Sequence, residues 1–113
     1  MSKYTYDAIV VRHIDGDTLR LDIDLGFGIW MRNRVVRLAE IDAPELVTED
    51  GRKSAEYVID RLPVGSKVTL VSIADTLEKY GRVLGKIFLK DVCINEELVA
   101  HGFASPYDQN KRG

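Results

Sequence analysis

Hydrophobic and polar positions alternate most regularly between Thr18 and Leu25. Leucine or isoleucine occupies every second position there, and polar or charged residues occupy the positions between. A period of two is typical of an antiparallel strand with one buried face. Weaker patterns rich in β-branched residues predict further strands over Tyr4 to His13, Ile29 to Ile41, Lys67 to Ile73 and Val83 to Leu89. After the last of these strands, a turn at Lys90 and Asp91 leads into Val92 to Ile94. The third segment loses its alternation near Val35 and Val36, which indicates a bulge or strong curvature.

Two helices are predicted from a different periodicity. Ala55, Val58, Ile59 and Leu62 recur at the spacing of one helix face, with Thr48 as the expected N-cap residue. Pro63 and Gly65 should end this helix. A shorter helix is expected over Glu96 to His101, with Asn95 as its N-cap and Gly102 just beyond its C-terminus.

The order of these elements is three strands, a helix, two strands and a helix. Strands outnumber helices and mostly follow one another directly, which favours an antiparallel barrel over a parallel sheet. The simplest fold that accommodates these elements is mainly β with helices (α+β). It is a five-stranded antiparallel Greek-key barrel of the OB-fold type. With 113 residues the chain is expected to be one domain, residues 1–113.

The amino-acid composition limits the kinds of functional site that the chain can form. The chain has one cysteine and two histidines, so an internal disulfide is excluded and a zinc site is disfavoured. The net charge of −2 argues against a large uniform positive field but leaves room for a local cationic cleft. No signal peptide or membrane span is evident, and a cytoplasmic location with no membrane partner is expected.

The segment HIDGDTLRLDID, residues 13 to 24, contains a run of aspartates. Asp22 and Asp24 share the polar strand face, where solvated charges are usual. Asp15 belongs to a Gly-containing turn. Asp17 has the parity of Leu19 and should point towards the barrel, where a carboxylate needs a partner.

That partner is expected in a second patch, RLAEIDAPE, residues 37 to 45. If the end of the third strand lies beside Asp17, the carboxylates of Asp17 and Asp42 and the Ala43 carbonyl could hold one hard cation. An Asp–Arg network that holds the barrel end together explains the same residues equally well. By parity Glu40 lies opposite Arg37 and is ranked as a rim charge.

A third patch, EKYGR at residues 78 to 82, places Lys79, Tyr80 and Arg82 on a tight turn. These side chains suit contact with a phosphate and stacking on a base, although charged turns are common. Elsewhere, Cys93 is expected to be a small buried residue. Phe27 and Trp30 could stack on a base, but packing at the strand end or covering the hairpin is the expected role.

The three patches together resemble the staphylococcal (micrococcal) nuclease family of OB-fold phosphodiesterases. DGDT (15 to 18), RLAEIDAPE (37 to 45) and KYGR (79 to 82) occur in the family's order and spacing. The resemblance implies a Ca²⁺ site and a catalytic set at the matching positions. Those positions are Asp17, Asp42 and the Ala43 carbonyl for the metal, Glu45 for the attacking water, Arg37 and Arg82 for the phosphate, and Lys79, Tyr80 and the late Tyr107 for the nucleotide.

The expected function is Ca²⁺-dependent hydrolysis of DNA and RNA by a monomer, with single strands preferred and 3′-phosphate ends left. A small nuclease of phage or mobile-element origin fits this description. The alternative is an inactive OB-fold module that binds single-stranded nucleic acid or protein. Under this resemblance, the segment between Glu45 and the first helix and the C-terminal segment are expected to be shorter than in the staphylococcal enzyme.

Overall fold

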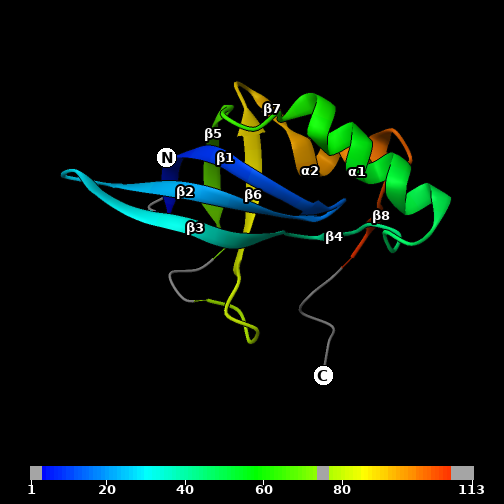
Figure 1. Cartoon of the computed structure of the whole chain (residues 1–113), viewed down its shortest axis with the longest axis horizontal. Helices are drawn as coiled ribbons and strands as arrows, with labels where there is room; N and C mark the ends of the chain where they lie inside the picture. Colours follow the sequence, from blue (N-terminus) through cyan, green and yellow to red (C-terminus); the bar gives the residue numbers. More distant parts are fainter. Residues whose placement is uncertain (1–3, 74–76, 108–113) are drawn as a thin grey trace.

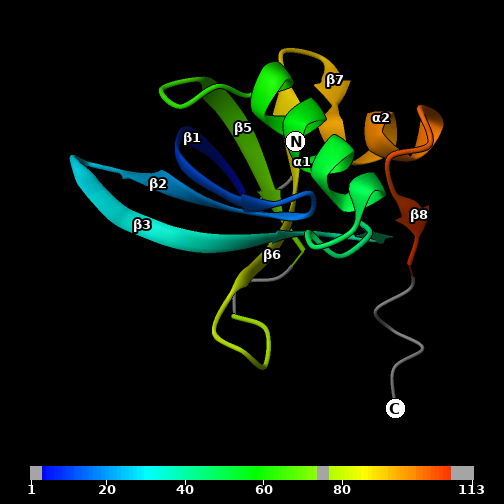
Figure 2. The same ribbon diagram turned by 45° about the vertical axis from the view of Figure 1, so that its right-hand side comes forward.

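The fold is built around a long antiparallel meander of three strands. In the computed structural model, which describes residues 4–73 and 77–107, these strands are β1 (Thr5–Asp15), β2 (Thr18–Gly26) and β3 (Ile29–Leu38). Two further long strands, β5 (Lys67–Ser72) and β6 (Val83–Leu89), follow helix α1 (Glu49–Arg61) and give the strand order β3-β2-β1-β5-β6. The two helices cover one end of this sheet (Figures 1 and 2).

The sheet closes on itself because β3 also pairs with β6. This pairing is parallel and runs from Val36↔Val83 to Leu38↔Gly85. The OB-fold barrel predicted from the sequence is therefore confirmed, but the expectation of a wholly antiparallel barrel is corrected at this one seam. The interior is filled by fully buried side chains from every barrel strand and both helices, including Leu19, Leu21, Val36, Leu38, Leu70, Ile87 and Leu98.

The β2–β3 register locates the irregularity in the third strand. Leu21 pairs with Arg34 but Ile23 pairs with Met31, so β3 has one extra residue between these pairs. Asn33 adopts a φ of 56° at this point. The bulge thus lies just before the Val35–Val36 position expected from the pattern. It leaves the alternation of β2 intact, although Leu25 beyond it is 40% exposed rather than buried.

The predicted third strand is two strands. β3 ends at Leu38, and β4 (Ile41–Asp42) begins after Glu40, whose φ of 67° breaks the extended backbone. β4 pairs with β8 (Ser105–Pro106), which lies beyond α2 in the sequence. This pairing brings the C-terminal part of the described chain beside the Asp42 segment, as Figure 1 shows.

Helix α1 begins as the sequence indicates. The Thr48 hydroxyl accepts a hydrogen bond from the Gly51 amide at 2.9 Å, which satisfies one of the free N–H groups at the helix start. Its buried face runs through Gly51, Ser54, Ala55 and Val58, whereas Ile59 is 46% exposed, contrary to its expected place on that face. At the other end, the Leu62 carbonyl lies 2.7 Å from His13 Nε2, which donates to it.

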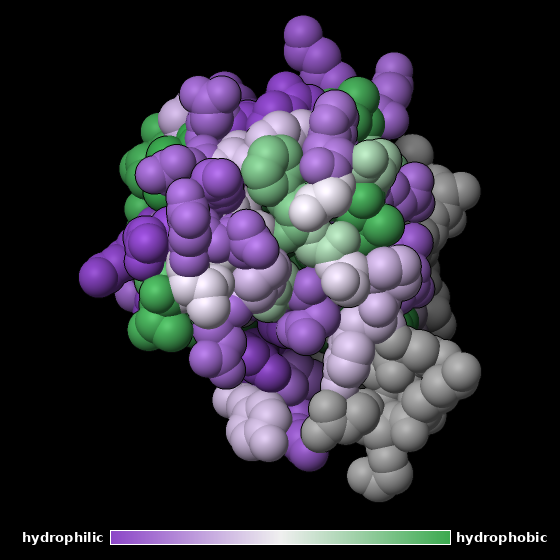
Figure 3. Space-filling view, turned by 90° about the vertical axis from the view of Figure 1, so that its right-hand side faces the viewer, coloured by the Kyte–Doolittle hydropathy of each residue, from purple (hydrophilic) through white to green (hydrophobic). Residues whose placement is uncertain are grey.

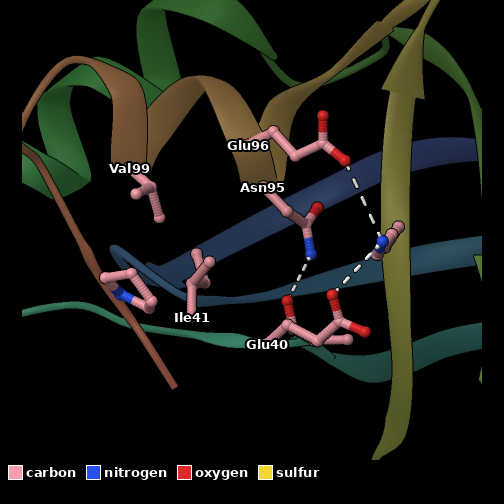
Figure 4. A pocket seen from close by; sticks show the side chains of 8 residues that line it. Glu40, Ile41, Asn95, Glu96 and Val99 are labelled. Carbon is pink, nitrogen blue, oxygen red and sulfur yellow. Dashed lines mark hydrogen bonds and ion pairs between the residues drawn. The ribbon is translucent and has the colours of Figure 1, made fainter. Parts of the chain in front are cut away.

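The second helix, α2 (Ile94–Ala100), follows β7 (Val92–Cys93) and begins before the expected position. Asn95 is not its N-cap: Cys93 occupies that position without a side-chain hydrogen bond. Asn95 is 1% exposed, and its amide accepts from Ile87 N at 3.0 Å and donates to the Ala39 and Gly85 carbonyls at 3.0 and 3.1 Å. Asn95 therefore ties α2 to β6 and to the end of β3 (Figure 4).

Other expectations for this region hold. Gly102 follows the end of α2 with a φ of 80°, as a residue at that position requires. Cys93 is buried, and burial raises the pKa of its thiol. Across the described ranges, none of the helices has the length and apolar character needed to cross a membrane.

Candidate functional site

Asp17 lies at the mouth of the barrel, immediately before β2. Asp17 is 8% exposed, which agrees with the inward orientation that strand parity predicts for it. Asp17 Oδ1 accepts the Thr18 hydroxyl at 2.9 Å, and Oδ2 accepts the Ala43 amide at 2.9 Å. The second of these bonds joins the DGDT turn to the segment after β4, so two of the sequence patches meet here.

Arg37 stands between the two aspartates of these patches. Its Nη2 atom lies 3.5 Å from Asp17 Oδ2 and 3.3 Å from Asp42 Oδ1, and its Nη1 donates to the Leu38 carbonyl at 2.6 Å. Arg37 and Asp17 are both buried, while the Asp42 side chain is 60% exposed. A buried guanidinium beside two carboxylates offsets their charge, and it leaves Asp42 open to solvent on one side.

The Asp15 carboxylate supports the turn rather than the site. Asp15 Oδ1 accepts the Asp17 amide at 3.0 Å, which is the role expected for an aspartate in a tight turn. Burial, followed by the hydrogen bond with Asp17, raises the pKa of Asp15. The turn is also closely packed, because a Cβ atom at Gly16 would lie 2.8 Å from Ser54 Cβ and 2.9 Å from Ala43 Cβ.

The donor atoms of this cluster match a hard divalent cation in type. Asp17 and Asp42 direct oxygen atoms to within 3.5 Å of one nitrogen, and ligands of a Ca²⁺ ion lie within about 5 Å of each other. Among the described residues no group of three or more acidic, histidine or cysteine side chains is placed to hold an ion. An ion held here would therefore need the Ala43 carbonyl and several water molecules in addition to the two carboxylates.

Glu45 is positioned through its backbone. The Glu45 carbonyl accepts both the amide and the hydroxyl of Thr48, at 2.9 and 2.7 Å. A Cβ atom at Gly51 would overlap that carbonyl oxygen and lie 2.8 Å from the Pro44 carbonyl. The N-terminus of α1 therefore packs directly on the loop that carries Glu45, and the Glu45 side chain itself is exposed.

Arg82 lies on the loop before β6 and is paired with a residue that sequence reasoning left without a role. Glu78 accepts Arg82 Nε and Nη2, each at 3.1 Å, and also accepts the Tyr80 and Arg82 amides at 2.8 and 2.9 Å. The hydrogen bond from Arg82 is the main cause that lowers the pKa of Glu78. The i, i+4 spacing of glutamate and arginine was the available signal for this pair.

The two arginines are brought near each other by the barrel seam. Arg82 immediately precedes Val83, which pairs with Val36, the neighbour of Arg37. The Asp17 carboxylate contributes, after Glu78, to the raised pKa of Arg82, which agrees with this proximity. The structure thus gathers Asp17, Arg37, Asp42 and Arg82 at one end of the barrel.

The residues expected to contact a nucleotide are more dispersed. Tyr80 is 71% exposed, and Lys79 Nζ and Arg82 Cζ lie 5.1 and 5.3 Å from the centroid of its ring. Tyr107 follows β8, and its amide donates to the Glu40 carbonyl at 2.8 Å. Tyr107 therefore lies on the β4 side of the site.

Figure 3 views the molecule from the end where β4, β8 and α1 lie, and that face is mostly hydrophilic with an apolar area at its centre.

The remaining acids have local partners. Asp22 accepts Arg32 Nη1 at 3.0 Å and the Asn33 amide at 2.8 Å, and Asp24 accepts the Gly26 amide at 2.8 Å. Glu40 is exposed and pairs with Lys86 at 3.2 Å (Figure 4), so its place at the rim is as expected. The parity given for Glu40 is wrong, because its positive φ interrupts the strand.

Comparison with known proteins agrees with the motifs. Residues 35–112 match the family described as staphylococcal nuclease homologue. The chain is similar to the endonuclease YhcR of Bacillus subtilis (strain 168), with 29% identity over 90% of this chain and 9% of that protein. It is also similar to the thermonuclease of Staphylococcus intermedius, with 30% identity over 85% of this chain and 56% of that protein.

A third relative is a probable staphylococcal-like nuclease, CAN3, from Oryza sativa subsp. japonica, with 30% identity over 67% of this chain and 19% of that protein. The chain spans little more than half of the thermonuclease and a far smaller share of the other two proteins. The family match covers more than half of this chain, on a barrel of the expected type. The chain belongs to the staphylococcal nuclease family.

Proposed function

We propose that the chain is a Ca²⁺-dependent endonuclease that hydrolyses DNA and RNA, prefers single strands and leaves 3′-phosphate ends. The observation that carries this proposal is the cluster of Asp17, Arg37 and Asp42 at the barrel mouth, with Arg82 beside it. Two carboxylates next to a phosphate would repel it unless a cation lies between them. The cluster therefore has the chemistry of a site that binds a metal cation and a phosphate together.

Asp17, Asp42 and the Ala43 carbonyl are the groups that would hold the ion. A bound Ca²⁺ would supply positive charge beside the phosphate. Arg37 would neutralise part of the negative charge that develops on the phosphate oxygens, since a guanidinium keeps its proton throughout. Because Arg37 contacts both aspartates and offsets only part of their charge, it would link the ion site to the phosphate site.

Arg82 is oriented for bidentate contact by its pair with Glu78. The carboxylate occupies the edge of the guanidinium formed by Nε and Nη2. The opposite edge, formed by Nη1 and the second hydrogen of Nη2, stays directed away from Glu78 and matches two phosphate oxygens. Glu78 thus acts as a positioning residue for Arg82.

Glu45 is the proposed general base, which would accept a proton from the water that attacks phosphorus. A base in this role must lie within about 3 Å of that water, so its loop has to be held accurately. The two hydrogen bonds from Thr48 to the Glu45 carbonyl and the close packing of Gly51 supply this constraint. Lys79, Tyr80 and Tyr107 are proposed to contact the nucleotide.

The direct test incubates the purified protein with end-labelled single strands of DNA and RNA, with Ca²⁺ or with a chelator. Cleavage is expected with Ca²⁺ alone, and Glu45→Ala and Arg82→Ala should each lower its rate by at least about 10²-fold. Glu56→Ala and Lys53→Ala, at two exposed positions on α1, are controls that should retain the rate. Equal cleavage in chelator, or unaltered rates in both site variants, would refute the assignment. Binding without cleavage in any divalent ion would instead support the inactive OB-fold module.

A further inference from the structure

The turn that follows Glu45 exposes two neighbouring aliphatic side chains. Leu46 is 44% exposed and Val47 is 82% exposed. Phe27, at the tip of the β2–β3 hairpin, is exposed at 103%, so the expectation that it packs at the strand end or covers the hairpin is wrong. That tip lies at the far end of the hairpin from β4, whereas Leu46 and Val47 come directly after the proposed general base (Figure 1). A substrate held at the site can therefore reach the aliphatic pair.

Hydrogen bonds to the backbone hold this turn in place. The amide and the hydroxyl of Thr48 both donate to the Glu45 carbonyl, at 2.9 and 2.7 Å, which closes a β-turn over residues 45–48. Arg52 Nη1 donates to the Val47 carbonyl at 3.1 Å. Leu46 and Val47 occupy the two central positions of the turn. Polar contacts thus fix the position of two apolar side chains that remain open to solvent.

The charges around the turn favour contact with a base over contact with a phosphate. Glu45 precedes the aliphatic pair and Glu49 and Asp50 follow it, all with exposed side chains that would repel a phosphate. The cationic groups of the next two residues are directed elsewhere, Arg52 to a backbone carbonyl and Lys53 to Glu49 at 3.7 Å. Apolar side chains, in contrast, form surfaces on which the face of an unstacked base can lie. The turn therefore suits a base of a strand held at the site.

The direction of attack decides which nucleoside lies beside the turn. A reaction that leaves a 3′-phosphate breaks the bond between phosphorus and the 5′-oxygen of the downstream nucleoside, on the 3′ side of the scissile phosphate. The attacking water enters opposite this leaving oxygen, because displacement at phosphorus is in line. Glu45, as the base for that water, therefore lies away from the downstream nucleoside. The residues next to Glu45 face the upstream nucleoside, whose 3′-oxygen stays on phosphorus.

We propose that Leu46 and Val47 bind the base of the nucleoside immediately upstream of the scissile phosphate. This inference rests on the proposed nuclease function, and it is separate from the nucleotide contacts proposed for Lys79 and Tyr80 on the loop before β6. In a duplex the faces of a base are covered by its stacked neighbours, so only an unstacked base can lie on the turn. The contact therefore favours single strands over duplex.

The test measures cleavage of a substrate with one cleavable bond. A single-stranded tetranucleotide keeps one phosphodiester, and neutral methylphosphonates replace the others. With Ca²⁺ present, the double variant Leu46→Ala with Val47→Ala should raise KM about tenfold and change kcat by less than about twofold, because the contact binds the base without touching the reacting atoms. The matched control is Ile59→Ala with Val64→Ala, which truncates aliphatic side chains of 46% and 65% exposure at the other end of α1 and should keep the wild-type KM.

Substrates that lack one base identify the partner of the turn. An abasic residue immediately upstream of the cleavable bond should raise the KM of the wild-type chain about tenfold. The same substrate should cost the Leu46→Ala and Val47→Ala double variant almost nothing further, since the contact is already lost and the two changes are not additive. An abasic residue immediately downstream should raise the KM of both proteins by the same factor, because the turn does not contact that nucleoside.

These measurements separate the inference from the proposed function. A wild-type KM in the double variant, additive effects of the variant and the upstream abasic residue, or coupling to the downstream residue instead would each overturn the inference and leave the nuclease assignment in place. If the wild-type chain cleaves no strand, the proposed function fails. Anisotropy of the same labelled tetranucleotides, with and without the upstream base, then decides by the same cycle of affinities whether the turn binds that base.

Discussion

Replacing Asn95 by alanine should destabilise the fold strongly, although Asn95 lies in a helix of only seven residues. Its amide group pairs with Ile87 N–H and with the Ala39 and Gly85 carbonyls inside the barrel. The Gly85 carbonyl also accepts the Ala39 amide at 2.8 Å, so it keeps one partner in the variant. Ile87 N–H and the Ala39 carbonyl lose the side-chain amide in a place that water does not reach.

The expected loss follows from these two groups. A buried polar group left without a partner costs about 1–3 kcal/mol, so the free energy of unfolding of Asn95→Ala should fall by about 4 kcal/mol. With an m-value of about 2 kcal/mol/M, the urea midpoint should fall by about 2 M. Far-UV circular dichroism against urea concentration measures both quantities.

The neighbouring exposed residue gives the control. Glu96→Ala removes only a 3.9 Å contact with Lys86 and should change stability by less than about 0.5 kcal/mol. A loss below about 1 kcal/mol in Asn95→Ala would show that the Ile87 and Ala39 groups find other partners. In that case Asn95 would not be the residue that ties the helix to the strands.

Three further predictions concern the site and its support. Asp17→Asn should weaken Ca²⁺ binding, measured as the Ca²⁺-dependent rise in Tm. Asp22→Asn should leave the Ca²⁺ affinity unchanged, because the Asp22 carboxylate faces Arg32. Equal weakening in the two variants would contradict the parity argument. Gly51→Ala should displace the loop that carries the proposed base and lower cleavage by at least about tenfold at saturating substrate, and a wild-type rate would show that the loop position is not critical. The hydrogen bond from Arg61 lowers the pKa of Glu97, so this pair stabilises the fold above the ordinary glutamate pKa and its contribution is lost as pH falls through the lowered value. The stability difference between wild type and Glu97→Gln, measured by urea unfolding, should therefore shrink as the pH falls below the ordinary glutamate pKa, and a constant difference would refute this assignment.

Strand parity in β2 could be predicted from the sequence because one face of the strand is buried from Leu19 to Ile23. Leu19, Leu21 and Ile23 are all buried, and Asp17 follows the same parity into the barrel mouth. The same reasoning failed at Glu40, because one residue with positive φ resets the alternation. Positive φ is uncommon for a glutamate, so the sequence does not predict it at this position.

Asn95 shows a second limit of sequence reasoning. An asparagine just before a helix is typical of an N-cap. Here its partners are Gly85 and Ile87 of β6 and Ala39, the residue after β3, which the folded barrel brings to it. The choice between a local cap and a buried connection depends on contacts that the local pattern does not contain.

The parallel β3–β6 seam makes completion of the barrel and assembly of the phosphate site one event. Arg37 and Arg82 are brought to the same end of the barrel when Val36 pairs with Val83, which lies 47 positions later in the sequence. Contacts between such distant segments form late in folding, because the intervening chain must first be ordered. In a partly folded chain in which the seam is open, Arg37 and Arg82 lie on unpaired segments, so the proposed hydrolytic site should be complete only in fully folded molecules. The recovery of activity during refolding should then follow closure of the seam rather than formation of the β1–β2–β3 meander.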